Sequence, residues 1–249
     1  MKSTTADPAT RPNAPMTSHR KTSLVAGTLY LLTFVSIPTL FLYNQVKTDS
    51  AYIAGSGPDT AIVFGGLLEV IVALACIGTG VALYPVVKRQ NEGVALGFVA
   101  ARVLEAAAIF AGVVALMSIV TLRQAGAGEG ALVTGQALLA QHSWTTLLGQ
   151  GLMPAFNALL LGSLMYRSRL LPRVLPVFGF IGAPLLIAGA VGQLFGVWGP
   201  VSVFSGLGAL FLTFWEFGMG IWLVVKGFNA EALARLTTPS TEPTVEAVR

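Results

Sequence analysis

Four ionisable residues lie inside long apolar stretches, where each charge needs either a partner or a function: Glu69, Arg102, Glu105 and Glu216. A charge near the centre of a membrane helix costs about 2.5–3.5 kcal/mol on the insertion scale. Such residues therefore turn toward the interior of a bundle and pair with one another. Carboxylates and an arginine at this depth can bind a polar group or hold and release a proton. We take these four as candidates for ligand binding or proton handling.

The spacing of the four residues predicts their partners. Arg102 and Glu105 are three residues apart, which places them on one face of a helix. Arg102 and Glu216 each lie ten residues from a charged residue that ends their span, about 15 Å along a helix axis. We predict that Arg102 contacts Glu216 or Glu105, and that Glu69, nearer the opposite side, completes a polar seam. The formal charge of −2 on the four leads us to expect at least one protonated carboxylate.

The composition places the chain in the membrane class. Of 249 residues, 54% are hydrophobic and 10% charged, and the mean hydropathy is +0.75. A membrane helix needs about 20 residues, so the length suits an all-α bundle of six transmembrane helices. We predict spans at 22–46, 60–87, 93–122, 143–166, 176–197 and 201–225, with a short surface helix at 131–141. Residues 1–20 are expected to form a disordered tail, residues 21–228 the membrane domain, and residues 229–249 a second tail.

The basic residues predict the orientation. When the spans alternate in direction, 12 of the 15 lysines and arginines fall on one side, two on the other, and Arg102 within a span. Lysine and arginine are retained on the cytoplasmic side of membrane proteins. Both termini are therefore predicted to be cytoplasmic.

The usual motifs for catalysis are missing. Neither a phosphate-binding loop nor a Ser-His-Asp order nor a His-Glu-x-x-His motif occurs, and the single cysteine, Cys76, excludes a cysteine-based metal site. We expect no catalytic residue, metal or cofactor and no nucleic-acid partner. His142 is expected to sit in a wet position at the outer interface. Asn157 and Gln193 are expected to hydrogen-bond between helices.

A weak internal repeat relates two predicted hairpins at an offset of 82 residues. Gly80 and Tyr84 match Gly162 and Tyr166, and the segment 97–101 matches 179–183. Such matches also arise by chance in sequences rich in Gly, Ala and Leu, so a repeat of spans two and three in spans four and five stays one of two alternatives.

Several segments, spread in order along the chain, resemble one protein family. They are residues 23–32, Leu67-Leu68-Glu69, residues 101–106 (ARVLEA), residues 168–173 (SRLLPR) and residues 222–228 (WLVVKGF). Together they resemble the bacterial domain of unknown function family 4386 over about residues 20–228. The resemblance implies a multi-pass protein of the bacterial cytoplasmic (inner) membrane, with the four charged residues at the family's polar positions. It carries over no catalytic or binding role.

Two classes of function remain open at this point. In one, the polar seam binds or moves a small solute, a lipid or a proton. In the other, the protein is a structural or regulatory membrane subunit whose seam holds the bundle together without a ligand. An intramembrane hydrolase is less favoured, because His142 and the carboxylates are predicted to be dispersed in depth. The lipid bilayer is the expected partner, and the sequence does not determine the oligomeric state.

Overall fold

The computed structural model describes residues 17–49 and 51–237, and every regular element within them is helical, which confirms the all-α prediction. The predictions for residues 1–16 and 238–249 lie outside this part of the chain. The elements in order are α1 (Ser18–Leu32), η1 (Thr33–Ser36), α2 (Thr39–Leu42), α3 (Asn44–Thr48), η2 (Tyr52–Ala54), α4 (Thr60–Val87), α5 (Glu92–Gln124), η3 (Glu129–Ala131), α6 (Leu132–Thr146), the π-helical segment η4 (Leu147–Leu152), α7 (Met153–Ser168), α8 (Val174–Leu194), α9 (Val203–Val225) and α10 (Ala230–Thr237).

Six helical segments in this part of the chain are long and apolar enough to cross a membrane, as the hydropathy pattern predicted. They comprise α1 with η1 and α2, then α4, α5, the run from η3 through α7, α8, and α9. The first begins at Ser18, slightly earlier than expected, because the Thr17 hydroxyl caps it by accepting a hydrogen bond from the Arg20 amide.

The fourth span differs from the prediction. The expected surface helix at 131–141 is not a separate element, because α6, η4 and α7 follow one another without a break, and the whole segment Glu129–Ser168 has 40 residues. Such a helix is about 60 Å long, twice the hydrocarbon thickness. The polar residues of α6 had suggested a surface helix, but here they extend the span beyond the apolar core.

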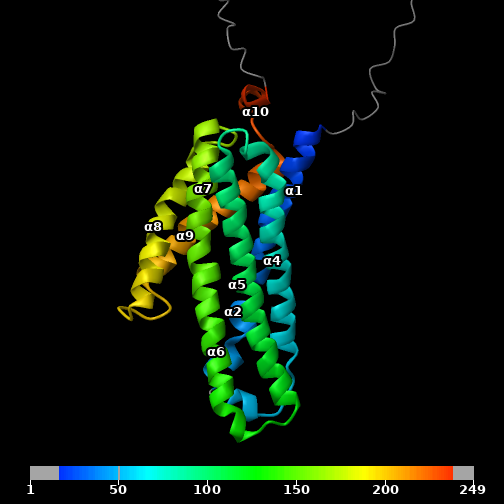
Figure 1. Ribbon diagram of the computed structural model, residues 1–249, viewed down its shortest axis with the longest axis vertical. Helices are drawn as coiled ribbons and strands as arrows, with labels where there is room; N and C mark the ends of the chain where they lie inside the picture. The colour runs from blue at the N-terminus through cyan, green and yellow to red at the C-terminus, as the bar shows by residue number, and fades with distance from the viewer. Residues whose placement is uncertain (1–16, 50, 238–249) are drawn as a thin grey trace, which may run out of the picture.

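The helices form an elongated bundle whose two halves differ (Figure 1). The start of α1 and the whole of α10 lie at the same end, and α4, α5 and the α6–α7 run reach the opposite end. The α8–α9 hairpin is shorter and leans to one side, so it covers only the half of the bundle near α10. The far half is built from α2, α3, α4, α5 and α6, with a buried cluster around Tyr43, Tyr52 and Ile62.

Glycines allow the α8–α9 hairpin to pack with its backbones in close contact. A Cβ atom on Gly208 would lie 2.7 Å from the backbone nitrogen of Leu186, and one on Gly182 would lie 2.9 Å from the carbonyl oxygen of Gly208. Small residues at helix interfaces serve the same purpose in many membrane proteins. The proposed repeat of hairpins stays a prediction, although α4–α5 and α7–α8 both pack as adjacent pairs.

Candidate functional site

Three of the four predicted residues form one ion-pair cluster. The Arg102 Nη1 atom lies 3.0 Å from Glu105 Oε2, and its Nη2 atom lies 2.9 Å from Glu216 Oε1. Arg102 is only 1% exposed. The predicted contact is therefore confirmed, and Arg102 joins both acids at once, so that it links α5 to α9.

Neighbouring helices complete the surroundings of this cluster. The Asn157 amide on α7 donates a hydrogen bond of 2.6 Å to Glu105 Oε2, as expected for a polar residue that joins helices. The guanidinium of Arg102 stacks over the ring of Tyr30 on α1, with its Cζ atom 4.8 Å from the ring centroid. This is a favourable cation–π geometry. The Arg102 Nη1 atom also donates to the Cys76 sulfur on α4 at 3.7 Å. Side chains from α1, α4, α5 and α9 thus surround one guanidinium, and α7 joins the cluster through Glu105.

Glu69 does not belong to this cluster, and here the predicted seam is wrong. Its two carboxylate oxygens accept hydrogen bonds from the Tyr43 hydroxyl at 3.1 Å and from the Gln150 amide at 3.2 Å. The side chain is buried, with 3% of the residue exposed. Within the described residues no basic group lies within ion-pair distance of it. The prediction failed because the rotation of α4 turns Glu69 toward η4, which carries Gln150, and toward Tyr43 in the break after α2.

His142 also departs from its predicted position. It is 2% exposed rather than wet, and its ring packs edge-on against Tyr43 with the centroids 5.5 Å apart. Its Nδ1 atom lies 3.3 Å from the Thr146 hydroxyl. Its Nε2 atom has no partner in the part of the chain that the structure describes. Tyr43 therefore connects Glu69 to His142, two groups that sequence reasoning kept apart.

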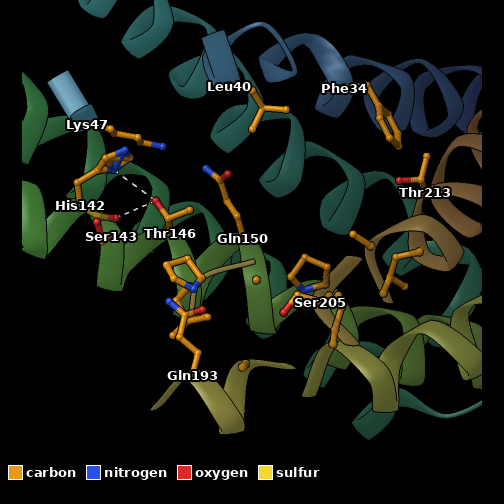
Figure 2. Close-up of a pocket in the computed structure, with 18 of the residues that line it drawn as sticks. Phe34, Leu40, Lys47, His142, Ser143, Thr146, Gln150, Gln193, Ser205 and Thr213 are labelled. Carbon is orange, nitrogen blue, oxygen red and sulfur yellow. Dashed lines mark hydrogen bonds between the residues drawn. The ribbon is translucent and has the colours of Figure 1, made fainter. Parts of the chain in front are cut away.

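A cavity of about 670 Å³ lies beside both groups of polar residues (Figure 2). Glu216 of the ion-pair cluster lines it, and so does Gln150, the donor to Glu69. The other lining residues are Phe34, Leu40, Lys47, Leu139, His142, Ser143, Thr146, Leu147, Gly151, Pro154, Leu186, Ala190, Gln193, Pro200, Ser205, Ala209, Leu212 and Thr213. Gln193 thus faces the cavity, and its side chain has no hydrogen-bond partner in residues 17–49 and 51–237, so the expected bond between helices is not found.

Irregular backbone borders this cavity on two sides. The first span breaks at η1 and Pro38, which brings Phe34 and Leu40 to the wall. The fourth span contains the π-helical segment η4, which supplies Leu147, Gln150 and Gly151. Pro154 follows η4 and has no amide hydrogen for the carbonyl of residue 150, which favours the wider turn. At membrane depth, irregular backbone is tolerated where it lines a cavity or is buried in protein.

A second ion pair, which the sequence did not reveal, closes the far end of the bundle. Asp59 immediately precedes α4, but its side chain makes no capping bond and pairs with Arg123 of α5. Tyr52 and Gln124 also donate to it, at 2.8 Å and 3.1 Å. Burial favours the neutral acid, but the three hydrogen bonds and the charge of Arg123 outweigh it, so the pKa of Asp59 lies below its ordinary value of 3.8. Here Arg123 ties the two helices together.

Comparisons with known proteins identify the family of the chain but assign no activity to it. Among the residues that the structure describes, there is no group of three or more His, Cys, Asp or Glu that could hold a metal ion. No characterised protein and no solved structure matches the chain. The family model described as "Domain of unknown function (DUF4386)" matches residues 25–227, which is most of the chain. The protein is therefore a multi-pass membrane protein that belongs to the DUF4386 family.

Proposed function

We propose that this protein binds a small amphipathic molecule in the cavity, with a cationic or hydrogen-bond-donating head group against Glu216. One observation carries the proposal: Glu216 belongs both to the buried ion-pair cluster and to the cavity wall. A charged group that was only structural would be enclosed by protein, whereas this carboxylate is presented to an open space.

The size and lining of the cavity suit such a ligand. Binding sites for small molecules usually measure about 300–1,000 Å³ and combine apolar walls with a few polar groups. This cavity has about 670 Å³. Figure 2 shows Lys47, His142 and Thr146 gathered toward one side, Phe34 and Thr213 toward another, and Gln150 between them. A ligand with an apolar body and polar groups fits this arrangement.

The charges favour a donor rather than an acceptor at Glu216. Arg102 faces two carboxylates, so the cluster has a formal charge of −1 when both are ionised. Glu105 receives further support from Asn157, whereas Arg102 is the one hydrogen-bond partner of the Glu216 carboxylate within the described residues. The excess negative charge therefore falls at the cavity wall, where a protonated amine would offset it and a hydroxyl could only donate a hydrogen bond to it.

The proposal is tested with three probes that share a ten-carbon chain: decylamine, decanol and decanoate. We expect saturable binding to the protein in nanodiscs, measured by native mass spectrometry, with decylamine bound most tightly. Ala209→Phe, which projects a ring into the cavity, should weaken the binding of all three probes. The matched Ala107→Phe, on an exposed face of α5 outside the cavity, should leave it unchanged.

Glu216→Gln separates the head-group contact from the apolar part of the site. It should remove the preference for decylamine over decanol and leave decanol binding intact. If none of the probes saturates, or if Ala209→Phe binds them like the wild type, the proposed function is wrong.

A purely structural role is the second candidate, and the enclosure of Glu105 favours it. This carboxylate is held by both Arg102 and Asn157, far from solvent. In that case Glu105→Gln and Glu216→Gln would both lower the melting temperature, and neither would change the binding of any probe. Transport of a solute or proton through the seam would appear instead as a flux into liposomes that Glu69→Gln or Glu105→Gln alters.

For the location, we propose the bacterial cytoplasmic membrane with both termini inside. The support is the family resemblance and the charge distribution. Arg20, Lys88, Arg167 and Lys226 lie at the end of the bundle near α10, where α1 starts and where the α4–α5 and α7–α8 connections lie (Figure 1).

A further inference from the structure

A second cavity, of about 550 Å³, lies at the basic end of the bundle, away from the site proposed above. Its wall is formed by the α7–α8 connection, the last turn of α9 and the linker to α10. The lining residues are Arg169, Leu170, Leu171, Pro172, Arg173, Trp222, Lys226, Gly227, Phe228 and Asn229. Three are cations and none is an acid, so the cavity has a strongly positive wall.

The cations of this wall are available to a ligand. Within residues 17–49 and 51–237, the Arg169 guanidinium and the Lys226 ammonium have no hydrogen-bond or ion-pair partner. Arg173 is oriented by its Nε atom, which donates to the Tyr166 carbonyl at 3.3 Å, and by its stacking at 4.8 Å over the Tyr166 ring. Its two Nη atoms stay free of partners in the same residues.

The backbone of this wall is held in place, which distinguishes it from a loose patch of surface charge. The Asn229 amide of the linker donates to the Leu170 carbonyl of the α7–α8 connection at 3.0 Å. Leu170 and Leu171 are buried in the core. Arg169 has a left-handed backbone with φ of 59°, a conformation that is strained for a non-glycine residue. Glycine would adopt this backbone conformation without strain. The chain nevertheless has an arginine at position 169, where the backbone favours glycine.

The position of the cavity indicates which anion would occupy it. It lies where α9 ends and α8 begins, which is the depth of lipid head groups if these helices span the bilayer. Trp222 on the wall is of the aromatic type found at that interface, and Phe228 adds a further apolar side chain to the wall. The neighbouring Val174 and Val225 are 57% and 62% exposed, and they offer an apolar surface for the start of acyl chains. Charge asymmetry alone would place cations at this end, but it would not build a walled cavity around them.

We propose that this cavity binds the phosphate of an anionic phospholipid from the adjacent leaflet, through Arg169, Arg173 and Lys226. Basic pockets between membrane helices bind such head groups in other proteins. The glycerol and the first acyl carbons would lie against Trp222 and Phe228. The inference does not depend on the ligand of the larger cavity or on which leaflet this end faces.

The test measures lipid retention by native mass spectrometry of the full chain released from nanodiscs. The nanodiscs contain phosphatidylglycerol and phosphatidylcholine with identical acyl chains in equal amounts. The wild type should keep phosphatidylglycerol in preference, and each cation removed should weaken that preference about fivefold. Arg169→Gln with Lys226→Gln should thus lose most of it. The matched pair Arg89→Gln with Arg167→Gln, at the same end but outside the cavity, should retain it.

Arg169→Gly keeps the test valid if the double variant folds poorly. It relieves the left-handed strain, so the melting temperature in phosphatidylcholine should be at least that of the wild type, while lipid retention falls. Unchanged retention in Arg169→Gly, or an equal loss in the matched pair, would overturn the proposal. Millimolar inorganic phosphate that raises the melting temperature in pure phosphatidylcholine as much as phosphatidylglycerol does would identify a site for free phosphate and also overturn it.

Discussion

At the scale of single residues, Arg102 is the cation that allows the carboxylates of Glu105 and Glu216 to lie inside the bundle. A guanidinium presents several donors in a fixed fork, and here two of its nitrogens serve two carboxylates on different helices. A lysine has one nitrogen and no planar face to stack on Tyr30. The arginine thus satisfies Glu105 and Glu216 while packing against an aromatic ring.

We predict that Arg102→Met destabilises the protein strongly. The substitution leaves two buried carboxylates without a cation, and losing one partner of a buried ion pair costs about 3–5 kcal/mol. The triple variant Arg102→Met, Glu105→Gln, Glu216→Gln should recover much of the loss, because no charge is then left unpaired. Melting temperatures in detergent, followed by tryptophan fluorescence, check both statements. A single variant that melts like the wild type would show that the cluster contributes little.

Asp59 predicts a pH dependence at the far end of the bundle. Its pKa is lower in the folded protein than its ordinary 3.8, so the unfolded chain binds the proton more readily. The stabilisation is therefore complete above about pH 4 and is lost as the pH falls through the folded pKa. Asp59→Asn should lower the melting temperature at pH 7 and flatten its fall below about pH 4. An identical acid profile in wild type and Asp59→Asn would exclude this ion pair as the cause.

At the scale of elements, the α8–α9 hairpin depends on the absence of side chains at its crossing. Gly208→Val would place a Cβ atom 2.7 Å from the backbone of Leu186, and backbone cannot move aside as a side chain can. Overpacking of this kind costs about 1–3 kcal/mol, and it would separate the two helices that form part of the large cavity. We expect a lower melting temperature and weaker decylamine binding.

Gly206→Val is the matched control on the same helix. A Cβ atom at Gly206 would meet no atom of another described segment within 4 Å, so the valine should be tolerated. If the two variants melt alike, the cost arises from valine in α9 itself rather than from the crossing.

Hydropathy and depth were sufficient to predict the six spans and the partners of Arg102. Counting residues along a helix gives depth reliably, because each residue advances by about 1.5 Å. Rotation is a different quantity. The helices are apolar on nearly all sides, so no stripe indicates which face turns inward, and this is why Glu69 was assigned to the wrong neighbours.

The cavity and the position of His142 could not be predicted for a related reason. Both depend on the irregular segments η1 and η4, whose bounds do not follow from composition. A proline inside an apolar run signals a break, but it does not say whether protein, water or lipid fills the space beside it. The pairing of Asp59 with Arg123, 64 residues apart, is likewise set by the packing of α4 on α5.

At the scale of the whole molecule, four of the five lysines allow the orientation to be tested on the wild-type protein. Lys47 lies on one side of the predicted membrane, and Lys21, Lys88 and Lys226 lie on the other; all four are exposed. In intact cells, a membrane-impermeant amine reagent should modify Lys47 and spare the other three. Peptide mass spectrometry of the purified protein provides the measurement.

Two controls complete this experiment. Opening the cells before labelling should make Lys21, Lys88 and Lys226 reactive, and Lys47→Arg should remove the signal seen in intact cells. Modification of Lys88 but not of Lys47 in intact cells would reverse the proposed orientation.

The single cysteine offers a built-in kinetic probe of the molecule's interior. Cys76 is 1% exposed and its sulfur lies against Arg102, so an alkylating reagent can reach it only when the helices around it part. At low reagent concentration the alkylation rate measures how often that separation occurs. An added molecule that slows the alkylation of Cys76 would do so by stabilising the closed bundle. The alkylation rate can therefore be used to screen for ligands of any chemical class.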